Sequence, residues 1–284
     1  MGDGDRGTRG ALLDKLGKGR TAANRASMKK YRAIAEYYDA ECAHHEMLRR
    51  DVPFLLGHLP RRRQSVLELA VGTGRAAIPL AQAGHRVVGV DYARDMLEIA
   101  GRKRDALGIS RRDLSFVCAD VLRLRLRRKF DWVVLLFNTF LAFQTLEDQD
   151  ALLQAVVRHL KPRGRFWLDI FQPNLQLIAQ PKSKNLDPVL FHVPELNRTV
   201  FRETRVQRDP ATQIQKVTFH YRWFDQRGTE HRQRVAFALT FVFPRELQLL
   251  LERNGLAIEK CYGDYDRSEL NADSPRMIAL CRRR

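Results

Sequence analysis

Residues 66 to 75 read Val-Leu-Glu-Leu-Ala-Val-Gly-Thr-Gly-Arg, an apolar run that leads into two glycines and then into a helical pattern. A strand, a glycine turn and a helix in this order form a cradle for a nucleotide-like ligand, because glycine has no Cβ to hold the backbone away from it. The helix that follows presents free N–H groups to the polar end of the ligand. The stretch therefore predicts the first strand, loop and helix of an α/β fold with a cofactor site.

The sequence after this stretch alternates between strand and helix patterns. Strands are expected at 65–70, 85–91, 114–120, 130–137 and 165–171, with helices at 75–84, 93–107 and 145–160. Such alternation predicts a doubly wound, mostly parallel sheet with helices on both faces. A helix at 244–254 and strands at 256–262 and 276–282 complete a seven-stranded sheet whose last strand is antiparallel.

Composition and periodicity divide the chain into five segments. We expect a disordered basic tail at 1–27, an N-terminal helical cap at 28–63, a cofactor-binding core at 64–171, an inserted antiparallel β meander at 172–243, and a C-terminal helix with the last two core strands at 244–284. The cap is predicted from Tyr31, Ile34, Ala35 and Tyr38, which recur at helical spacing, and from a second short helix at 53–59. The meander is predicted from β-patterned runs at 199–206, 214–224 and 230–243.

Polar residues follow the ends of successive strands. Asp91 ends the second strand, where a carboxylate can accept both hydroxyls of a ribose. Asp120 ends the third, where it and the backbone of Val121 can meet an adenine, and the fourth ends at Phe137 and Asn138. Each residue alone also fits a purely structural role, as a turn glycine or a helix cap. Their combination at consecutive strand ends favours the cofactor site.

With these motifs in place, residues from about 35 to 284 resemble the class I S-adenosylmethionine-dependent methyltransferases of the small-molecule branch. The motifs that carry the resemblance are 66–75, 87–97, 116–120 and 159–166. The resemblance implies that Glu68 supports the glycine loop, that Asp91 holds the ribose and that Asp120 lies by the adenine. The usual first motif has glycine where this chain has Ala70, so slightly altered loop geometry is expected.

The resemblance extends to a set of residues around S-adenosylmethionine, the implied cofactor. The expected cofactor residues are Tyr38, Glu68, Ala70, Gly72, Thr73, Gly74, Arg75, Asp91, Tyr92, Met96, Asp120, Val121, Phe137 and Asn138. No metal is expected, because the four cysteines are scattered without a CxxC pair. The segment Ala35-Glu-Tyr-Tyr-Asp39 and the meander resemble covering parts of amino-sugar and glycine-type N-methyltransferases.

The acceptor implied by that second resemblance is a small molecule methylated on an amine nitrogen. A neutral amine needs no base before it attacks, whereas a hydroxyl acceptor would need one. The candidates for such a group are His220 in the meander, and Asp264 and Tyr265 in the Gly-Asp-Tyr-Asp loop. Alternation places His220 opposite the aromatic face of its strand, which favours a solvent-facing structural role instead.

Three other functions stay open at this point. Gly72-x-Gly74-x-x-Ala77 with a later acid also satisfies the dinucleotide fingerprint of NAD-binding oxidoreductases, but Glu68 inside the strand argues against it. The net charge of +17 suggests an RNA or DNA methyltransferase, although 39 of the 50 basic residues are arginines spread along the chain. Phe137 to Phe140 also lacks the Asn/Asp-Pro-Pro-aromatic signature that clamps a flipped base. The third is a protein of this fold that binds partners without catalysis.

The remaining expectations concern partners and compartment. The longest apolar runs are far shorter than the roughly 20 residues of a membrane span, and no signal-peptide pattern opens the chain. A cytoplasmic protein without membrane contact is therefore expected, with a small-molecule acceptor as its partner. The aromatic face of the meander also makes a homodimer through that sheet an open expectation.

Overall fold

The computed structural model describes residues 35–180, 182–184 and 188–284. The tail expected at 1–27, and Tyr31 and Ile34 of the expected cap, lie outside the described residues. The first half comprises α3 (Ala35–His44), α4 (Glu46–Leu56), β1 (Ser65–Leu69), α5 (Ala77–Gln82), β2 (Arg86–Asp91), α6 (Arg94–Ala106), β3 (Leu114–Cys118), η2 (Val121–Arg123), β4 (Phe130–Leu135), η3 (Thr139–Ala142), α7 (Leu146–His159) and β5 (Leu160–Phe171). The second half comprises α8 (Leu175–Ile178), β6 (Lys182–Lys184), β7 (Val189–Val193), η4 (Pro194–Leu196), β8 (Arg198–Asp209), β9 (Ile214–Phe224), β10 (Glu230–Thr240), α9 (Pro244–Arg253), β11 (Leu256–Tyr262) and β12 (Arg276–Arg283).

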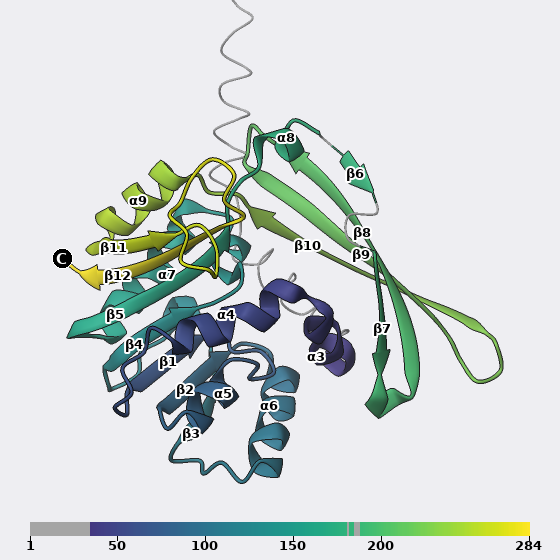
Figure 1. Ribbon diagram of the computed structural model, residues 1–284, viewed down its shortest axis with the longest axis horizontal. Helices are drawn as coiled ribbons and strands as arrows, with labels where there is room; N and C mark the ends of the chain where they lie inside the picture. The colour runs from purple at the N-terminus through teal and green to yellow at the C-terminus, as the bar shows by residue number, and fades with distance from the viewer. Residues whose placement is uncertain (1–34, 181, 185–187) are drawn as a thin grey trace, which may run out of the picture.

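Seven strands form the sheet expected from the alternating pattern, in the order β11-β12-β5-β4-β1-β2-β3 (Figure 1). Strands β1 to β5 run parallel, and β12 inserts antiparallel to β5 and β11. Val66 at the centre pairs with Val87 of β2 and Trp132 of β4. The doubly wound sheet with an antiparallel last strand is thus confirmed, and its carboxyl edge gathers the ends of β1, β2 and β4.

Helices cover both faces of this sheet, as its continuous apolar strands require. Leu55 of α4 and Leu80 of α5 are buried in one hydrophobic cluster together with Trp167 of β5. Leu152 of α7 and Leu251 of α9 are buried in the other cluster, on the opposite face. The two clusters fix the strands, and so fix the loops at the carboxyl edge.

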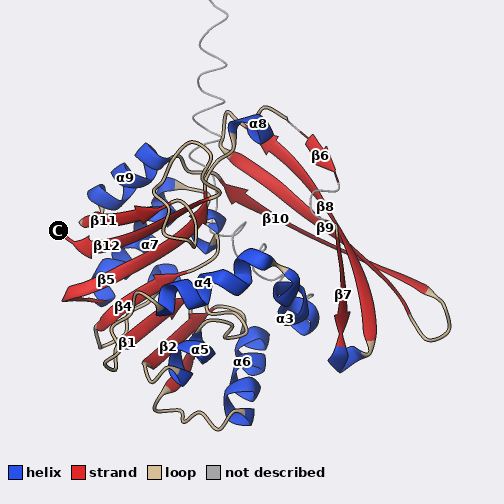
Figure 2. Ribbon diagram, in the orientation of Figure 1, coloured by secondary structure: helices blue, strands red, loops and turns tan. Residues whose placement is uncertain are grey.

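A second, antiparallel sheet forms the meander, in the order β10-β9-β8-β6, with β7 also paired to β8 (Figure 2). The three long strands were expected, but β6 and β7 fall in and just after a segment, 172–188, whose polar residues and prolines favour a loop. The reason is tertiary pairing: Phe191 and Val193 of β7 are buried in a third cluster with Tyr37 of α3. Helix α3 therefore lies between the two sheets (Figure 1).

The helix expected at 53–59 was placed wrongly. Helix α4 begins at Glu46 and continues through Pro53, because burial of Phe54 and Leu55 outweighs the backbone hydrogen bond that proline cannot donate. Across the described part of the chain, none of the helices combines the length and apolar character that a membrane span requires.

Candidate functional site

A cavity of about 430 Å³ lies at the carboxyl edge of the seven-stranded sheet. Its walls come from α3, from the loops after β1, β2 and β4, and from the inner face of the second sheet. Eight of the expected cofactor residues line it: Tyr38, Ala70, Gly72, Asp91, Tyr92, Met96, Phe137 and Asn138. The other six, which are Glu68, Thr73, Gly74, Arg75, Asp120 and Val121, do not.

The glycine loop turns sharply beneath this cavity. Ala70, Gly72 and Gly74 all have positive φ, at 55°, 55° and 80°. A Cβ at Gly72 would meet no atom within 4 Å, so a side chain there would project into space that the cavity provides. A Cβ at Gly74 would approach Ala100 of α6 to 3.3 Å, so that glycine serves close packing. Ala70 holds a conformation that glycine prefers, which explains why glycine is usual at this position.

Asp91 joins the loop to the end of β2. Its Oδ2 accepts a hydrogen bond from Gly72 N at 2.8 Å, and its Oδ1 accepts one from Ala93 N at 2.8 Å. Burial raises the pKa of Asp91, and the backbone N–H groups of Ala93 and Gly72 oppose that rise. The carboxylate is therefore held in one orientation at the cavity wall, next to the glycine loop.

Glu68 lies under the loop rather than in the cavity. It is buried, and burial raises its pKa to about 8 although the Arg75 guanidinium and Ala77 N–H favour the ionised form. Its Oε2 has no hydrogen-bond partner among the described residues. Buried carboxylate oxygens usually have a hydrogen-bond partner, and a ligand bound at the glycine loop can supply one. The open space at Gly72 leaves room for such a ligand.

Two contacts tie α3 to the cofactor side of the cavity. Thr73 Oγ1 donates to Asp39 Oδ1 at 2.6 Å, and Lys103 Nζ of α6 donates to Asp39 Oδ2 at 2.7 Å. Thr73 is thus buried by a protein contact, which is why it does not line the cavity. Arg75 likewise turns away, because its guanidinium pairs with Asp51 of α4.

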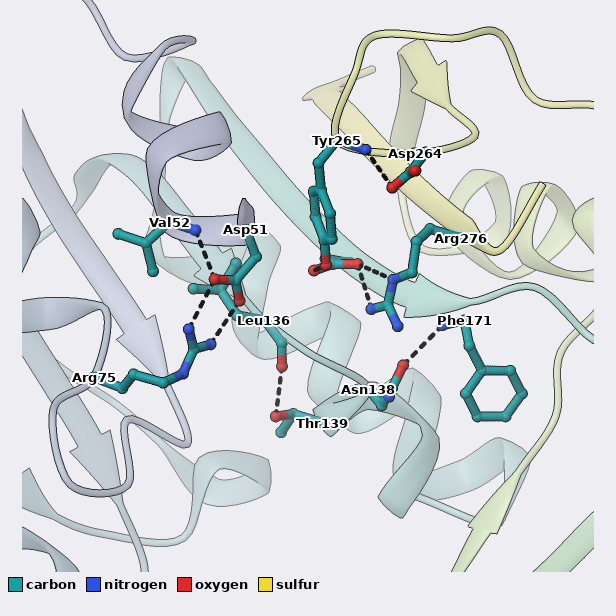
Figure 3. A network of polar contacts seen from close by, with 11 residues as sticks. Asp51, Val52, Arg75, Leu136, Asn138, Thr139, Phe171, Asp264, Tyr265 and Arg276 are labelled. Carbon is teal, nitrogen blue, oxygen red and sulfur yellow. Dashed lines mark hydrogen bonds and ion pairs between the residues drawn. The ribbon is translucent and has the colours of Figure 1, made fainter. Parts of the chain in front are cut away.

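The end of β4 is held in an unusual backbone conformation. Phe137 and Asn138 have φ of 42° and 67°, in the left-handed region that non-glycine residues rarely adopt. Asn138 N donates to Asp169 O at 3.0 Å, and Asn138 Oδ1 accepts from Phe171 N at 2.7 Å (Figure 3). The Arg276 guanidinium lies 5.1 Å from the Phe137 ring centroid. These contacts present both side chains to the cavity.

Asp120 and Val121 take a structural position. Asp120 Oδ1 accepts from Leu122 N at 3.0 Å and so caps the short helix η2. This is the helix-cap alternative that the sequence left open for Asp120. Ala119 N donates to Asp91 O at 2.9 Å, so the end of β3 lies beside Asp91, and the role of Asp120 and Val121 at an adenine stays a prediction.

The structure does not bring the three expected catalytic candidates into the cavity. His220 of β9 pairs in register with Glu203 and Arg234, on the sheet face opposite Phe219, which does line the cavity. Strand alternation is the reason, since neighbouring side chains point to opposite faces.

The Gly-Asp-Tyr-Asp loop packs behind the strand ends instead. Tyr265 Oη donates to Asp169 Oδ2 at 2.7 Å, and its pKa is raised mainly by burial (Figure 3). Asp264 accepts from Arg50 Nη1 at 3.3 Å. The Asp169 carboxylate also accepts from Arg276 Nε at 2.9 Å. Tyr265, Asp169 and Arg276 thus form a buried cluster that contacts Phe137 and Asn138 on the side away from the cavity.

The polar side chains that line the cavity and that sequence reasoning missed include Glu41, His45, Arg202, Thr204 and Gln215. His45 lies at the break between α3 and α4, with extended backbone (φ −88°, ψ 109°). Its ring meets the Phe137 ring edge-on, with centroids 5.3 Å apart. Among the described residues, it is the one histidine that lines the cavity. The alternating pattern of β8 was the available signal for Arg202 and Thr204, but their contacts depend on how the two sheets meet.

A second depression, of about 720 Å³, lies on the outer face of the meander, lined by Leu190, Phe201 and Phe224 among others. It has neither the glycine loop nor a strand-end carboxylate of the first sheet. The cavity at the carboxyl edge is therefore the candidate site.

The chain is similar to known methyltransferases. Residues 66–164 match the family described as methyltransferase domain. The cypemycin N-terminal methyltransferase of a Streptomyces species is 38% identical over 122 residues, which are 43% of this chain and 48% of that protein. The chain spans about half the length of the first curated relatives that it matches.

Solved structures share the fold over nearly the whole chain. The CcbJ methyltransferase of Streptomyces caelestis has a TM-score of 0.72 at 24% identity, covering 88% of this chain and 96% of its own. CalS10 of Micromonospora echinaspora, an amino pentose methyltransferase solved with S-adenosylmethionine bound, has a TM-score of 0.58 at 18% identity, covering 99% and 98%. The expected fold is confirmed, while the S-adenosylmethionine cofactor and the roles of single residues stay predictions.

Proposed function

We propose that this chain, which carries a methyltransferase domain of the S-adenosylmethionine-dependent fold over residues 66–164, transfers a methyl group to an amine nitrogen of a small molecule. The observation that carries the proposal is the cavity, which joins the glycine loop and Asp91 to a wall from the second sheet. A cavity of about 430 Å³ suits small-molecule ligands, and the second sheet covers one side of it.

The residues present fit the cofactor. Gly72 leaves open space at the loop, Asp91 offers a fixed carboxylate for the ribose, and Tyr38 and Met96 lie in the same cavity. S-adenosylmethionine supplies an electrophilic methyl group on a positively charged sulfur. The protein aligns the acceptor with that methyl group and keeps water out, which are the main requirements of an in-line displacement.

We assign the proton transfer to His45. An alkyl amine is mostly protonated near neutral pH and must lose that proton before its nitrogen can attack. The nitrogen then bonds to the methyl carbon as the carbon–sulfur bond breaks, and the positive charge passes from sulfur to nitrogen. Two neighbouring groups are poor proton acceptors: Glu41 accepts from Tyr221 Oη at 2.9 Å, and burial raises the pKa of the Cys42 thiol to about 12. Imidazole is the side chain suited to take a proton near neutral pH.

The amine is supported by the names of relatives, since the cypemycin enzyme is an N-terminal methyltransferase. Labelled S-adenosylmethionine should therefore yield methyl incorporation into a small-molecule amine fraction of a cell extract. Incorporation at a defined site of RNA or DNA, with turnover that survives physiological salt, would favour the nucleic-acid alternative. The cytoplasmic location and the homodimer through the second sheet also stay predictions.

A further inference from the structure

The half of the cavity away from the glycine loop is walled by the inner face of the second sheet. The residues of the three long strands that line it there are Arg202 and Thr204 of β8, Gln215, Val217 and Phe219 of β9, and Phe237 and Leu239 of β10. Four of these seven side chains are apolar. Alternation along each strand places them on one face, because successive side chains point to opposite faces. An acceptor in this half would rest mainly on aromatic and aliphatic surface.

The charges of this wall are balanced within the protein. Arg202 forms an ion pair with Glu41 of α3, and both side chains are largely buried. Tyr221 Oη also donates to Glu41 at 2.9 Å, and the Arg202 guanidinium lies 4.6 Å from the Phe219 ring centroid. A further charge on an acceptor body would lose its hydration here without gaining a counter-charge from the described residues of this half. The wall therefore disfavours acceptors that carry an additional charged group.

Thr204 is a polar residue of this wall whose buried hydroxyl the described part of the protein leaves without a partner. The residue is 7% exposed, and its buried Oγ1 has no hydrogen-bond partner among the described residues. Buried hydroxyls in folded proteins nearly always have a partner. Because Thr204 lines the cavity, a polar atom of a ligand can provide that partner.

We propose that this half of the cavity is an acceptor subsite that selects molecules uncharged apart from the reacting nitrogen. Such a molecule has an apolar body and one hydrogen-bonding group that contacts Thr204 Oγ1. The inference deepens the proposed function and rests on it for the identity of the reacting nitrogen. Recognition of the body is a separate property, and it can be measured with compounds that cannot be methylated on nitrogen.

The experiment titrates the full-length protein, saturated with S-adenosylhomocysteine, with four one-ring probes followed by NMR. The probes are toluene, p-cresol, phenyl phosphate and benzenesulfonate. We expect p-cresol to bind at least about tenfold more tightly than either charged probe, since an unpaired buried charge costs more than an unpaired hydroxyl. Thr204→Val should weaken p-cresol binding by about 3- to 10-fold, the usual worth of one hydrogen bond, and leave toluene unchanged.

Two variants keep the test independent of folding. Thr204→Ser retains the hydroxyl and should retain p-cresol affinity. Thr218→Val makes the same chemical change on β9 at a residue that does not line the cavity, and should have no effect on any probe. Unchanged S-adenosylhomocysteine affinity in all three variants shows that the cofactor side is intact.

Three results overturn the proposal: charged probes that bind as tightly as p-cresol, no binding of any probe, or p-cresol affinity that Thr204→Val leaves intact. The proposed function fails separately, if amines are not methylated while the probe results hold. In that case the acceptor subsite is supported, and the assignment of nitrogen as the methylated atom is rejected.

Discussion

Arg75 and Asp51 form a two-point ion pair, with Nη1–Oδ1 at 2.7 Å and Nη2–Oδ2 at 2.6 Å. Arg75 follows the last glycine of the loop and Asp51 lies on α4, 24 residues earlier, so the pair joins the cap to the loop. Arg75 Nη1 also donates to Leu48 O at 3.1 Å. An arginine that the sequence placed at the cofactor thus positions the loop from behind.

Removal of this arginine should destabilise the fold. Arg75→Met leaves Asp51, which is 1% exposed, without its counter-charge, and should lower the free energy of unfolding by about 3 kcal/mol. Urea denaturation measures the loss. The matched control is Arg253→Met, which breaks an exposed pair with Asp150 at 2.6 Å and should cost less than about 1 kcal/mol. Equal losses in the two variants would contradict a structural role for the Arg75 pair.

The assignment of the ribose carboxylate is tested by affinity. Asp91→Ala should weaken S-adenosylhomocysteine binding by roughly 1–3 kcal/mol, because partners of the carboxylate are left unpaired. Asp150→Ala serves as the control, since Asp150 pairs with Arg253 and does not line the cavity. Isothermal titration should show a loss for the first variant alone. Equal affinities of the two variants would contradict the assignment of Asp91 to the ribose.

The proton acceptor is tested by the pH dependence of turnover. His45→Gln should lower kcat by about 100-fold and remove the fall in rate at acidic pH, because a protonated imidazole cannot accept a proton. The KM for S-adenosylmethionine should stay the same. His44→Gln is the neighbouring control, since His44 is exposed and its Nδ1 contacts Ala40 O at 3.0 Å. A His45→Gln enzyme with the wild-type pH profile would exclude the assignment.

Glu68 makes stability depend on pH. Its pKa of about 8 lies above the ordinary value of 4.5, so the folded state binds the proton more tightly than the unfolded state. Below pH 4.5 Glu68 is protonated in both the folded and the unfolded state, so it adds no pH dependence to the free energy of unfolding. Between pH 4.5 and about 8 that free energy falls as the pH rises. Glu68→Gln removes this dependence, so its stability relative to wild type should increase from pH 5 to pH 8 in urea titrations. A constant difference across that range would show that Glu68 does not titrate as described.

The cofactor side was largely predictable from sequence because its signals are local. The glycines at 72 and 74 are required by positive φ, and Asp91 lies at a strand end that hydrophobicity alone defines. Eight of the fourteen expected residues line one cavity. The exceptions have physical reasons: Thr73 and Arg75 bond to α3 and α4, and those partners are 34 and 24 residues away in sequence.

The acceptor side was not predictable, because it forms only when two sheets and a helix meet. No pattern near His45 indicates that a break between α3 and α4 brings its ring to Phe137. Thr204 likewise lines the cavity beside Phe219, which lies opposite it on β9, 15 residues later in the chain. His220 was chosen by residue type, whereas the pleat of β9 places it on the other face.

The second sheet lies between β5 and α9 in the chain and contributes one wall of the cavity, while the residues matching the methyltransferase domain end at 164. The two walls are thus encoded by separate stretches of the gene. Mutations in 172–243 can remodel what the enzyme accepts while the glycine loop keeps its sequence, and insertions in the strand connections leave the parallel core untouched. Acceptor recognition can therefore change during evolution while cofactor binding is kept. Exchange of this one segment between homologous proteins should transfer acceptor preference with it.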